Sequence, residues 1–107
     1  MSSTLIMQHY EKALEVTRAM LDAAQKSDWD QLVTLEKERG ALVDRLRVID
    51  GDPGGDPAVR ERKRNIIQEI MTCDEQVQIL TQDWMRELRE VLGSISAEQK
   101  LSRTYGT

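Results

Sequence analysis

The longest unbroken segment of this chain runs from Ala58 to Leu92 and contains no glycine or proline. Its apolar side chains recur every three or four residues, which is the spacing of one stripe along an α-helix. At 1.5 Å per residue such a helix is roughly 50 Å long, more than a small globular domain needs. The stripe therefore has to be shared with other helices, a second copy or a partner, which favours a binding protein over an enzyme. The stripe consists of Val59, Lys63, Ile66, Ile70, Cys73, Val77, Leu80, Trp84, Leu88 and Val91.

Two shorter helices are predicted ahead of this segment. The first spans Thr4 to Gln25, and the second begins after Ser27, a favourable N-cap that places Asp30 at N3, where a carboxylate suits the helix dipole. Because the break between them is short, the two helices are expected to fold back as an antiparallel hairpin. The first stripe is Ile6, Tyr10, Ala13, Thr17, Met20 and Ala24, widened by Leu14 and Leu21, and the second is Leu32, Leu35, Arg39, Leu42, Leu46 and Ile49.

The segment from Gly51 to Pro57 is rich in glycine and proline and separates the second helix from the long one. Asp56 and Pro57 supply an N-cap and an N1 proline for the long helix. Gly93 suits the left-handed position just past its end, and a capping box that begins at Ser96 predicts a short final helix.

These elements predict an all-α fold: an antiparallel helical hairpin packed on a long third helix, with a short C-terminal helix. Residues 1–93 form the predicted three-helix domain, and residues 94–107 form a short helical tail. The composition agrees, because 39% apolar and 32% charged residues suit a helical hairpin or coiled coil, in which one stripe is buried and the rest is solvated.

Charge, cysteine content and hydropathy exclude several classes of function. A net charge of −4 argues against a nucleic-acid binder, which needs a basic face. The single cysteine, Cys73, cannot form an internal disulfide, so a reducing compartment is expected. The N-terminus lacks the pattern of a signal peptide, and no segment approaches 18 consecutive apolar residues. We therefore expect a cytoplasmic protein without membrane insertion.

Basic residues crowd the start of the third helix and the end of the second, on either side of the loop. They are expected to form a solvated face paired with Asp44 and Glu61, and a site for an anionic partner is the alternative. The cluster lacks interleaved aromatic residues for base stacking, which disfavours nucleic acid. Its members are Arg45, Arg47, Arg60, Arg62, Lys63 and Arg64.

Arg39 and Lys63 lie on otherwise apolar stripes. Long cationic side chains usually reach past the edge of a core into solvent. The alternative is a small anionic ligand held inside the bundle, as in short all-helical chorismate mutases, and this is the enzymatic function weighed against a binding function. The stripes offer no further internal polar groups to match such a pocket.

No metal, cofactor or catalytic residue is predicted. The loop from Asp50 to Glu61 matches an EF-hand count only in part, because Gly54 stands where a ligand is needed and Pro57 where an apolar residue is usual. A polar turn is the expected structure. His9 has no metal-binding neighbours at suitable spacing, and Cys73 has no histidine partner, so no nucleophile and base are paired.

The order of these motifs resembles that of the FliT-type flagellar export chaperones over nearly the whole chain. The resemblance is carried by Trp29, Asp30, Leu32, Leu35, Glu36, Arg39, Leu42 and Leu46, then by a Gly/Pro loop, by Ile66-Ile67 through Asp74-Glu75-Gln76, and by Lys100-Leu101 and Tyr105-Gly106. It implies a small cytoplasmic helical chaperone that binds the C-terminal part of the filament-cap protein FliD and delivers it to the flagellar type III export apparatus. Some members also bind the master transcriptional activator of flagellar genes.

The client is expected to dock on the far stretch of the third helix, where the hairpin is too short to cover the stripe. The predicted partner-binding residues are Ile67, Val77, Leu80, Trp84 and Leu88. A homodimer would use the same surface. The predicted gating and export tail carries Ile95, Leu101 and Tyr105, and it is expected to dock on this stretch and compete with the client.

Overall fold

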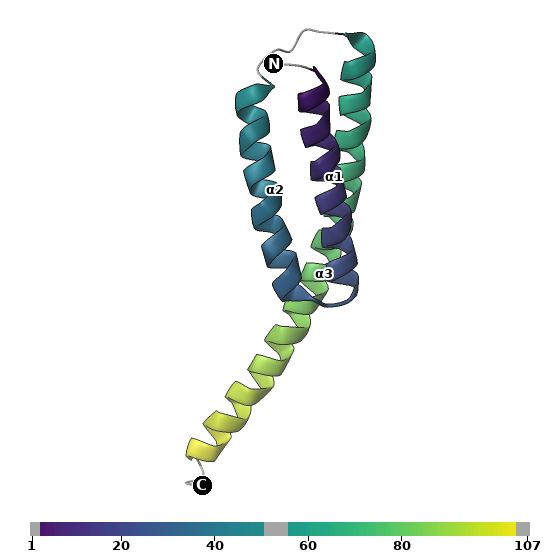
Figure 1. The fold of residues 1–107 in the computed structure, drawn as a ribbon. Helices are drawn as coiled ribbons and strands as arrows, with labels where there is room; N and C mark the ends of the chain where they lie inside the picture. The colour runs from purple at the N-terminus through teal and green to yellow at the C-terminus, as the bar shows by residue number, and fades with distance from the viewer. Residues whose placement is uncertain (1–2, 51–55, 105–107) are drawn as a thin grey trace. The chain divides into compact units, whose positions relative to one another are not determined.

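The computed structural model describes the backbone of residues 3–50 and 56–104 and the side chains of residues 4–50 and 56–93. Within these ranges the chain forms three helices and no strand: α1 (Ser3–Gln25), α2 (Trp29–Ile49) and α3 (Pro57–Thr104) (Figure 1). The predicted all-α class is confirmed.

The contacts divide the chain into two compact units within α3. The first unit comprises Met1–Val77 and the second Gln78–Thr107. The first unit therefore holds α1, α2 and the beginning of α3, and the groups described below as a site all belong to it. The division expected at residue 93 stays a prediction.

The turn between α1 and α2 differs from the prediction in one residue. Ser27 has a φ of 58° and ends α1 instead of capping α2. Its N–H donates to the Ala24 carbonyl at 3.1 Å, and the Asp28 N–H donates to the Ala23 carbonyl at 2.8 Å, which together form a Schellman motif. The N-cap of α2 is Asp28, whose Oδ1 accepts from the Gln31 N–H at 3.3 Å. Ser27 cannot cap α2, because terminating α1 requires its left-handed conformation.

The start of α3 is as predicted. The helix begins at Pro57, and Asp56 Oδ1 accepts a hydrogen bond from the Ala58 N–H at 2.9 Å. The carboxylate thereby satisfies one of the N–H groups that the first turn leaves without a helical partner.

The end of α3 is not as predicted, because the helix continues through Gly93 to Thr104. The separate short C-terminal helix was therefore a wrong prediction. Gly93 has no left-handed φ, so it is an interior helix residue and not a C′ residue. A glycine weakens a helix by only about 1 kcal/mol, which does not suffice to end it when both sides favour helix. Ile95 and Leu101 belong to α3 with side chains outside the described set, and Tyr105 lies outside the described residues.

The core of the first unit is built from all three helices, which lie side by side in Figure 1. Met7 and Leu14 of α1 and Ile66 of α3 form a buried cluster, against which Tyr10, Val59 and Ile70 pack. The other buried apolar residues of this unit are Ala13, Val16, Met20, Ala23, Ala24, Leu32, Leu35, Leu46 and Val77.

The predicted stripe of α3 is confirmed up to Leu88, because each of its residues from Val59 onward is buried or half-buried, while Val91 is exposed. The stripe of α1 was predicted too narrow. Met7, Val16 and Ala23 are also buried. The wider face follows from the packing of α1 against both α2 and α3.

Gly93→Ala tests the continuity of α3. A Cβ at this position meets no atom within 4 Å, so alanine fits and should stabilise the helix by roughly 0.5–1 kcal/mol. We expect higher ellipticity at 222 nm and slower amide exchange around residue 93. Gly40→Ala in α2, where the added Cβ likewise meets nothing, is the matched control. A loss of helicity in Gly93→Ala alone would restore the C′ position and the separate final helix.

Candidate functional site

A carboxylate at the end of α2 joins the three helices of the first unit. Asp50 is the C-cap residue of α2, and its backbone N–H donates to the Leu46 carbonyl at 2.9 Å. The Tyr10 hydroxyl of α1 donates to Asp50 Oδ2 at 2.6 Å, and Lys63 Nζ of α3 donates to Asp50 Oδ1 at 2.7 Å. Lys63 Nζ also lies 5.6 Å from the centre of the Tyr10 ring, within the range of a cation–π contact.

The pKa values of this polar node reflect its partial burial. Burial, together with the hydrogen bond to the negative Asp50 carboxylate, raises the pKa of the Tyr10 hydroxyl to about 12. Burial alone would raise the pKa of Asp50, but the hydrogen bonds from Lys63 and Tyr10 outweigh it and lower the pKa. At neutral pH Asp50 is therefore ionised, Tyr10 is protonated, and the charge of Asp50 is compensated by Lys63.

A second polar node lies further along the same helices. The Arg39 guanidinium of α2 donates to the Asp74 carboxylate of α3 and, at 3.3 Å, to the Thr17 hydroxyl of α1. Thr17 is fully buried, and its hydroxyl donates to the Ala13 carbonyl at 2.7 Å. Among the described residues, no buried side-chain nitrogen or oxygen lacks a hydrogen-bond partner.

These pairs agree with neither of the two alternatives left open for the internal cations. Arg39 and Lys63 neither reach past the core into solvent nor line an anion pocket, because each is paired with an aspartate of another segment. A mutase-like site would need both cations for its ligand, so this arrangement disfavours it.

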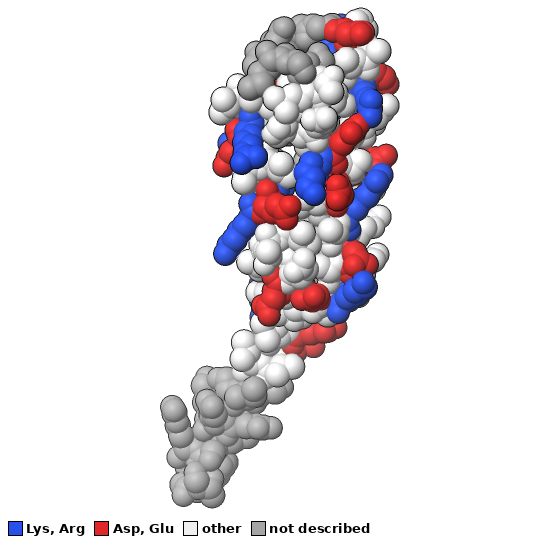
Figure 2. Space-filling model, in the orientation of Figure 1, with Lys and Arg blue, Asp and Glu red and all other residues white. Residues whose placement is uncertain are grey.

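The predicted basic cluster is largely paired as well. Arg47 contacts Asp44 at 3.9 Å and Arg64 contacts Glu61 at 3.6 Å, as the sequence suggested, and Arg62 pairs with Glu11 of α1. On the face shown in Figure 2, acidic and basic side chains alternate along the helices and do not gather into a patch of one sign.

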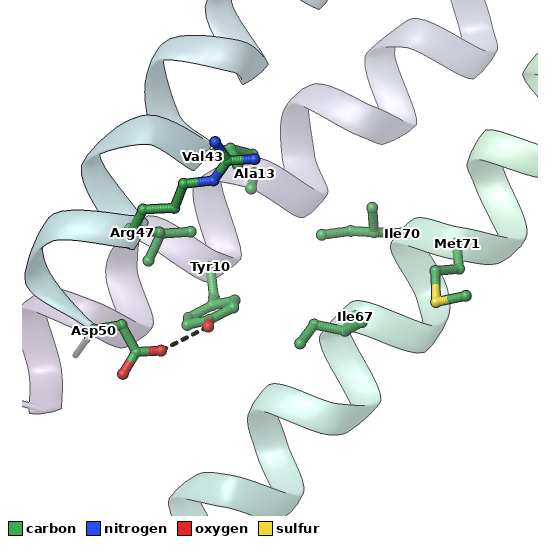
Figure 3. Close-up of a pocket in the computed structure, with 9 residues that line it drawn as sticks. Tyr10, Ala13, Val43, Arg47, Asp50, Ile67, Ile70 and Met71 are labelled. Atoms are coloured by element: carbon green, nitrogen blue, oxygen red, sulfur yellow. Dashed lines mark hydrogen bonds between the residues drawn. The ribbon is translucent and has the colours of Figure 1, made fainter. Parts of the chain in front are cut away.

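The first unit carries an apolar groove of about 380 Å³ on its surface. The side chains that line it come from all three helices, with Tyr10 and Asp50 close together and Ile67, Ile70 and Met71 projecting from α3 (Figure 3). Among the described residues, the lining consists of Tyr10, Ala13, Val43, Leu46, Arg47, Asp50, Ile67, Ile70 and Met71.

Apolar side chains at the edges of the groove remain open to solvent. Val43 of α2 is 36% exposed, and Ile67 and Met71 of α3 are 42% and 64% exposed. Apolar residues that border a concave surface on two helices are typical of a site for another apolar surface. Among the described residues, the groove offers hydrophobic contacts and the exposed guanidinium of Arg47. We take this groove as the candidate functional site.

The structure places the predicted partner-binding residues in different environments. Ile67 lines the groove, whereas Val77 is a core residue with only 6% of its surface exposed. Leu80, Trp84 and Leu88 belong to the second unit and are half-buried there. The partner-binding role of these residues and the gating role of the tail residues stay predictions.

Sequence analysis missed most of the groove, because it sought the site where the third helix outruns the hairpin. A usable signal was present: Val43 and Met71 are large apolar residues just beside the predicted stripes. Such residues widen the apolar face of a helix beyond what its core contact needs. Arg47 was considered only as part of the basic cluster.

The described parts of the chain hold neither a metal-ligand cluster nor a membrane-spanning helix. No group of three or more histidine, cysteine, aspartate or glutamate side chains gathers there as metal ligands would. The loop residues Asp52, Gly54 and Gly55 lie outside the described residues. None of the helices has, in its described part, a stretch long and apolar enough to cross a bilayer.

The family model and the relatives that match this chain all carry the same description. The family model described as "Flagellar protein FliT" matches residues 7–107. Proteins of that name from Serratia proteamaculans and Citrobacter koseri are 28% and 30% identical to the chain, over 91% and 92% of its length and 80% and 79% of theirs. The protein of that name from Yersinia pseudotuberculosis is 27% identical over 94% of this chain and 84% of its own length. No solved structure gives a significant match.

Asp50→Asn tests the polar node through pH. The pKa of Asp50 is lower in the folded state, so its contribution to stability is present at neutral pH and is lost as the pH falls through its folded pKa. We expect Asp50→Asn to lower the free energy of unfolding at pH 7 by roughly 1.5–3 kcal/mol, the usual worth of hydrogen bonds to a charged group.

Urea unfolding at pH 7 and pH 3 measures this effect. The difference between wild type and Asp50→Asn should shrink at pH 3, because below the ordinary pKa of 3.8 the carboxylate of the unfolded chain takes up a proton more readily than that of the folded chain, which reduces the stability that the ionised Asp50 contributes. Asp44→Asn, at an exposed carboxylate of the same helix, should leave stability almost unchanged at both pH values. A difference that stays the same at the two pH values would contradict the ionised Asp50 node.

Proposed function

The chain belongs to the FliT flagellar protein family, and from this membership we propose that it is a non-enzymatic export chaperone that binds the filament-cap protein FliD. In this proposal it acts in the cytoplasm and delivers FliD to the flagellar type III export apparatus. Binding of the master transcriptional activator of flagellar genes is a further activity suggested by the sequence resemblance. Direct binding of nucleic acid is not proposed, because the chain carries a net charge of −4.

The apolar groove of the first unit is the proposed client site, and its exposed apolar edge is the observation that carries the proposal. Val43, Ile67 and Met71 leave apolar surface in contact with water on both sides of a concave surface. Covering this surface with a client is favourable by roughly 25 cal/mol for each Å² of apolar area buried. A chaperone that holds an exported protein needs such a surface, since its client is recognised before assembly.

The shape of the groove favours a helical client segment. On α2 the lining residues stand at positions 43, 46, 47 and 50, which is the i, i+3, i+4, i+7 pattern of one helix face. This face extends over two turns, roughly 10 Å. An amphipathic client helix that inserts apolar anchors at the same spacing would match it. We therefore propose that a helix from the C-terminal part of FliD occupies the groove.

Two valines of α2, one in the groove and one outside it, provide a test of the client site. Val43 lines the groove, whereas Val48, on the same helix, is 82% exposed and is not among the lining residues. Val43→Asp should weaken binding of purified FliD by about tenfold or more, because it places a charge among desolvated apolar contacts. Val48→Asp adds the same charge to the same helix and should change the affinity less than about twofold.

Calorimetric titration with FliD from the same organism measures these affinities, and thermal unfolding of each variant shows that the fold is retained. Equal affinities of Val43→Asp and wild type, with both chains folded, would place the client elsewhere. Failure of the wild type to bind FliD would overturn the proposed function itself.

The gating role of the tail, residues 94–107, stays part of the proposal, but the continuous α3 adds a condition to it. Residues 94–104 continue α3, and one continuous helix cannot pack on its own preceding turns. Competition between the tail and the client at Val77, Leu80, Trp84 and Leu88 therefore requires α3 to break at Gly93 when the client is absent. The same residues, and Ile95, Leu101 and Tyr105 of the tail, stay predicted sites for the client, a homodimer contact or the export step.

Deletion of residues 94–107 tests the gating role. If the tail competes with the client, only chains with an undocked tail can bind it. The deletion should then tighten FliD binding by a factor equal to the reciprocal of the fraction of full-length chains whose tail is undocked. Gly93→Ala should act in the same direction, because it disfavours the break that gating requires. Calorimetry on the full and shortened chains decides this, and equal or weaker affinity after deletion would exclude the gate.

A further inference from the structure

The charges along the client groove differ in their availability to a ligand. Of the described residues that line the groove, two are charged: Arg47 and Asp50. Asp50 is 13% exposed at its side chain, and its two oxygens accept from Tyr10 and Lys63 at 2.6 and 2.7 Å. Its negative charge is therefore compensated within the protein.

The positive charge of Arg47, by contrast, is available to a ligand. Its side chain is 77% exposed, and the ion pair that the structure gives it is a 3.9 Å contact with Asp44, which is also highly exposed. Such i,i+3 pairs on a helix surface contribute little to stability, typically below 1 kcal/mol, and are easily exchanged for another partner. The guanidinium presents planar donors that suit a carboxylate in two-point contact.

We propose that Arg47 is a specificity-determining residue that selects a client helix carrying an acidic side chain beside its apolar anchors. This inference rests on the proposed function, because it concerns the same groove. A carboxylate placed there faces one available cation and a compensated aspartate. A lysine or arginine placed there would face the cation of Arg47 and an aspartate whose oxygens are already occupied, so the groove disfavours it.

The position of Arg47 fixes where the acidic side chain must lie. Arg47 is one turn after Val43 and one turn before Asp50 on the groove face of α2, so it stands between the two ends of the apolar lining. The acidic residue of the client is therefore flanked by apolar anchors on both sides along its helix. An acidic residue beyond the last anchor would not reach the guanidinium.

Charge reversal at Arg47, with a matched control, tests this inference. Arg47→Glu should weaken binding of purified FliD by about tenfold, since it replaces attraction with like-charge repulsion at the interface. Arg45→Glu makes the same change on α2, but Arg45 is exposed and is not among the groove residues. Residues two apart face different sides of a helix, so Arg45→Glu should change the affinity less than about twofold.

Two further measurements identify the interaction as a charge pair. Added salt should weaken wild-type binding more than it weakens binding by Arg47→Met, because screening acts on the pair that the methionine variant lacks. One Asp→Lys or Glu→Lys substitution in the C-terminal helix of FliD should recover binding to Arg47→Glu and lose binding to wild type.

The outcomes separate this inference from the proposed function. If Val43→Asp weakens FliD binding while Arg47→Glu and Arg45→Glu bind equally well, the groove holds the client but Arg47 does not select it, and the inference is wrong. If no charge substitution in the client rescues Arg47→Glu, the inference is also wrong. If the wild-type chain does not bind FliD, the proposed function and this inference fail together.

Discussion

The carboxylate of Asp50 joins the end of α2 to both of its neighbours, through the Tyr10 hydroxyl of α1 and the Lys63 ammonium of α3. A displacement of one of these helices by a turn would leave a partly buried carboxylate and ammonium unpaired. Removing one member of such a pair is strongly destabilising. We infer that this node fixes the axial register of the three helices, and that the groove depends on it.

The contact among Arg39, Thr17 and Asp74 has the same effect at another level of the bundle. Two such nodes specify the register better than one, because a shift must break both at once. They also explain why charged residues interrupt apolar stripes in this chain. Arg39 and Lys63 are internal cations whose aspartate partners come from other segments, so neither of these two cations is available to a small anionic ligand.

With the interior polar groups paired, the groove lined by α1, α2 and α3 is the surface that we propose for the client. Among the described residues that line it, the charged ones are the compensated Asp50 and the exposed Arg47. Such a lining suits the chaperone function that we propose for this FliT family member. In that proposal, recognition depends on the spacing of apolar anchors along a client helix, with charge as the means of discrimination.

The sequence by itself determined the helices, because local periodicity and capping chemistry are encoded within a few residues: the stripe of α3 and its start at Asp56-Pro57 were both predicted correctly. It also showed the family through the order of its motifs. Tertiary structure alone decided which face is shared by two neighbours, as with Met7 and Val16, and which distant aspartate pairs with each internal cation. Pairing across 13 or 35 residues leaves no local pattern, so the nodes and the groove between them emerged only when the helices were packed together. Gly93 differs from these cases, because its place inside α3 follows from local preference: the helix-forming residues on both sides outweigh the weak stop signal of one glycine.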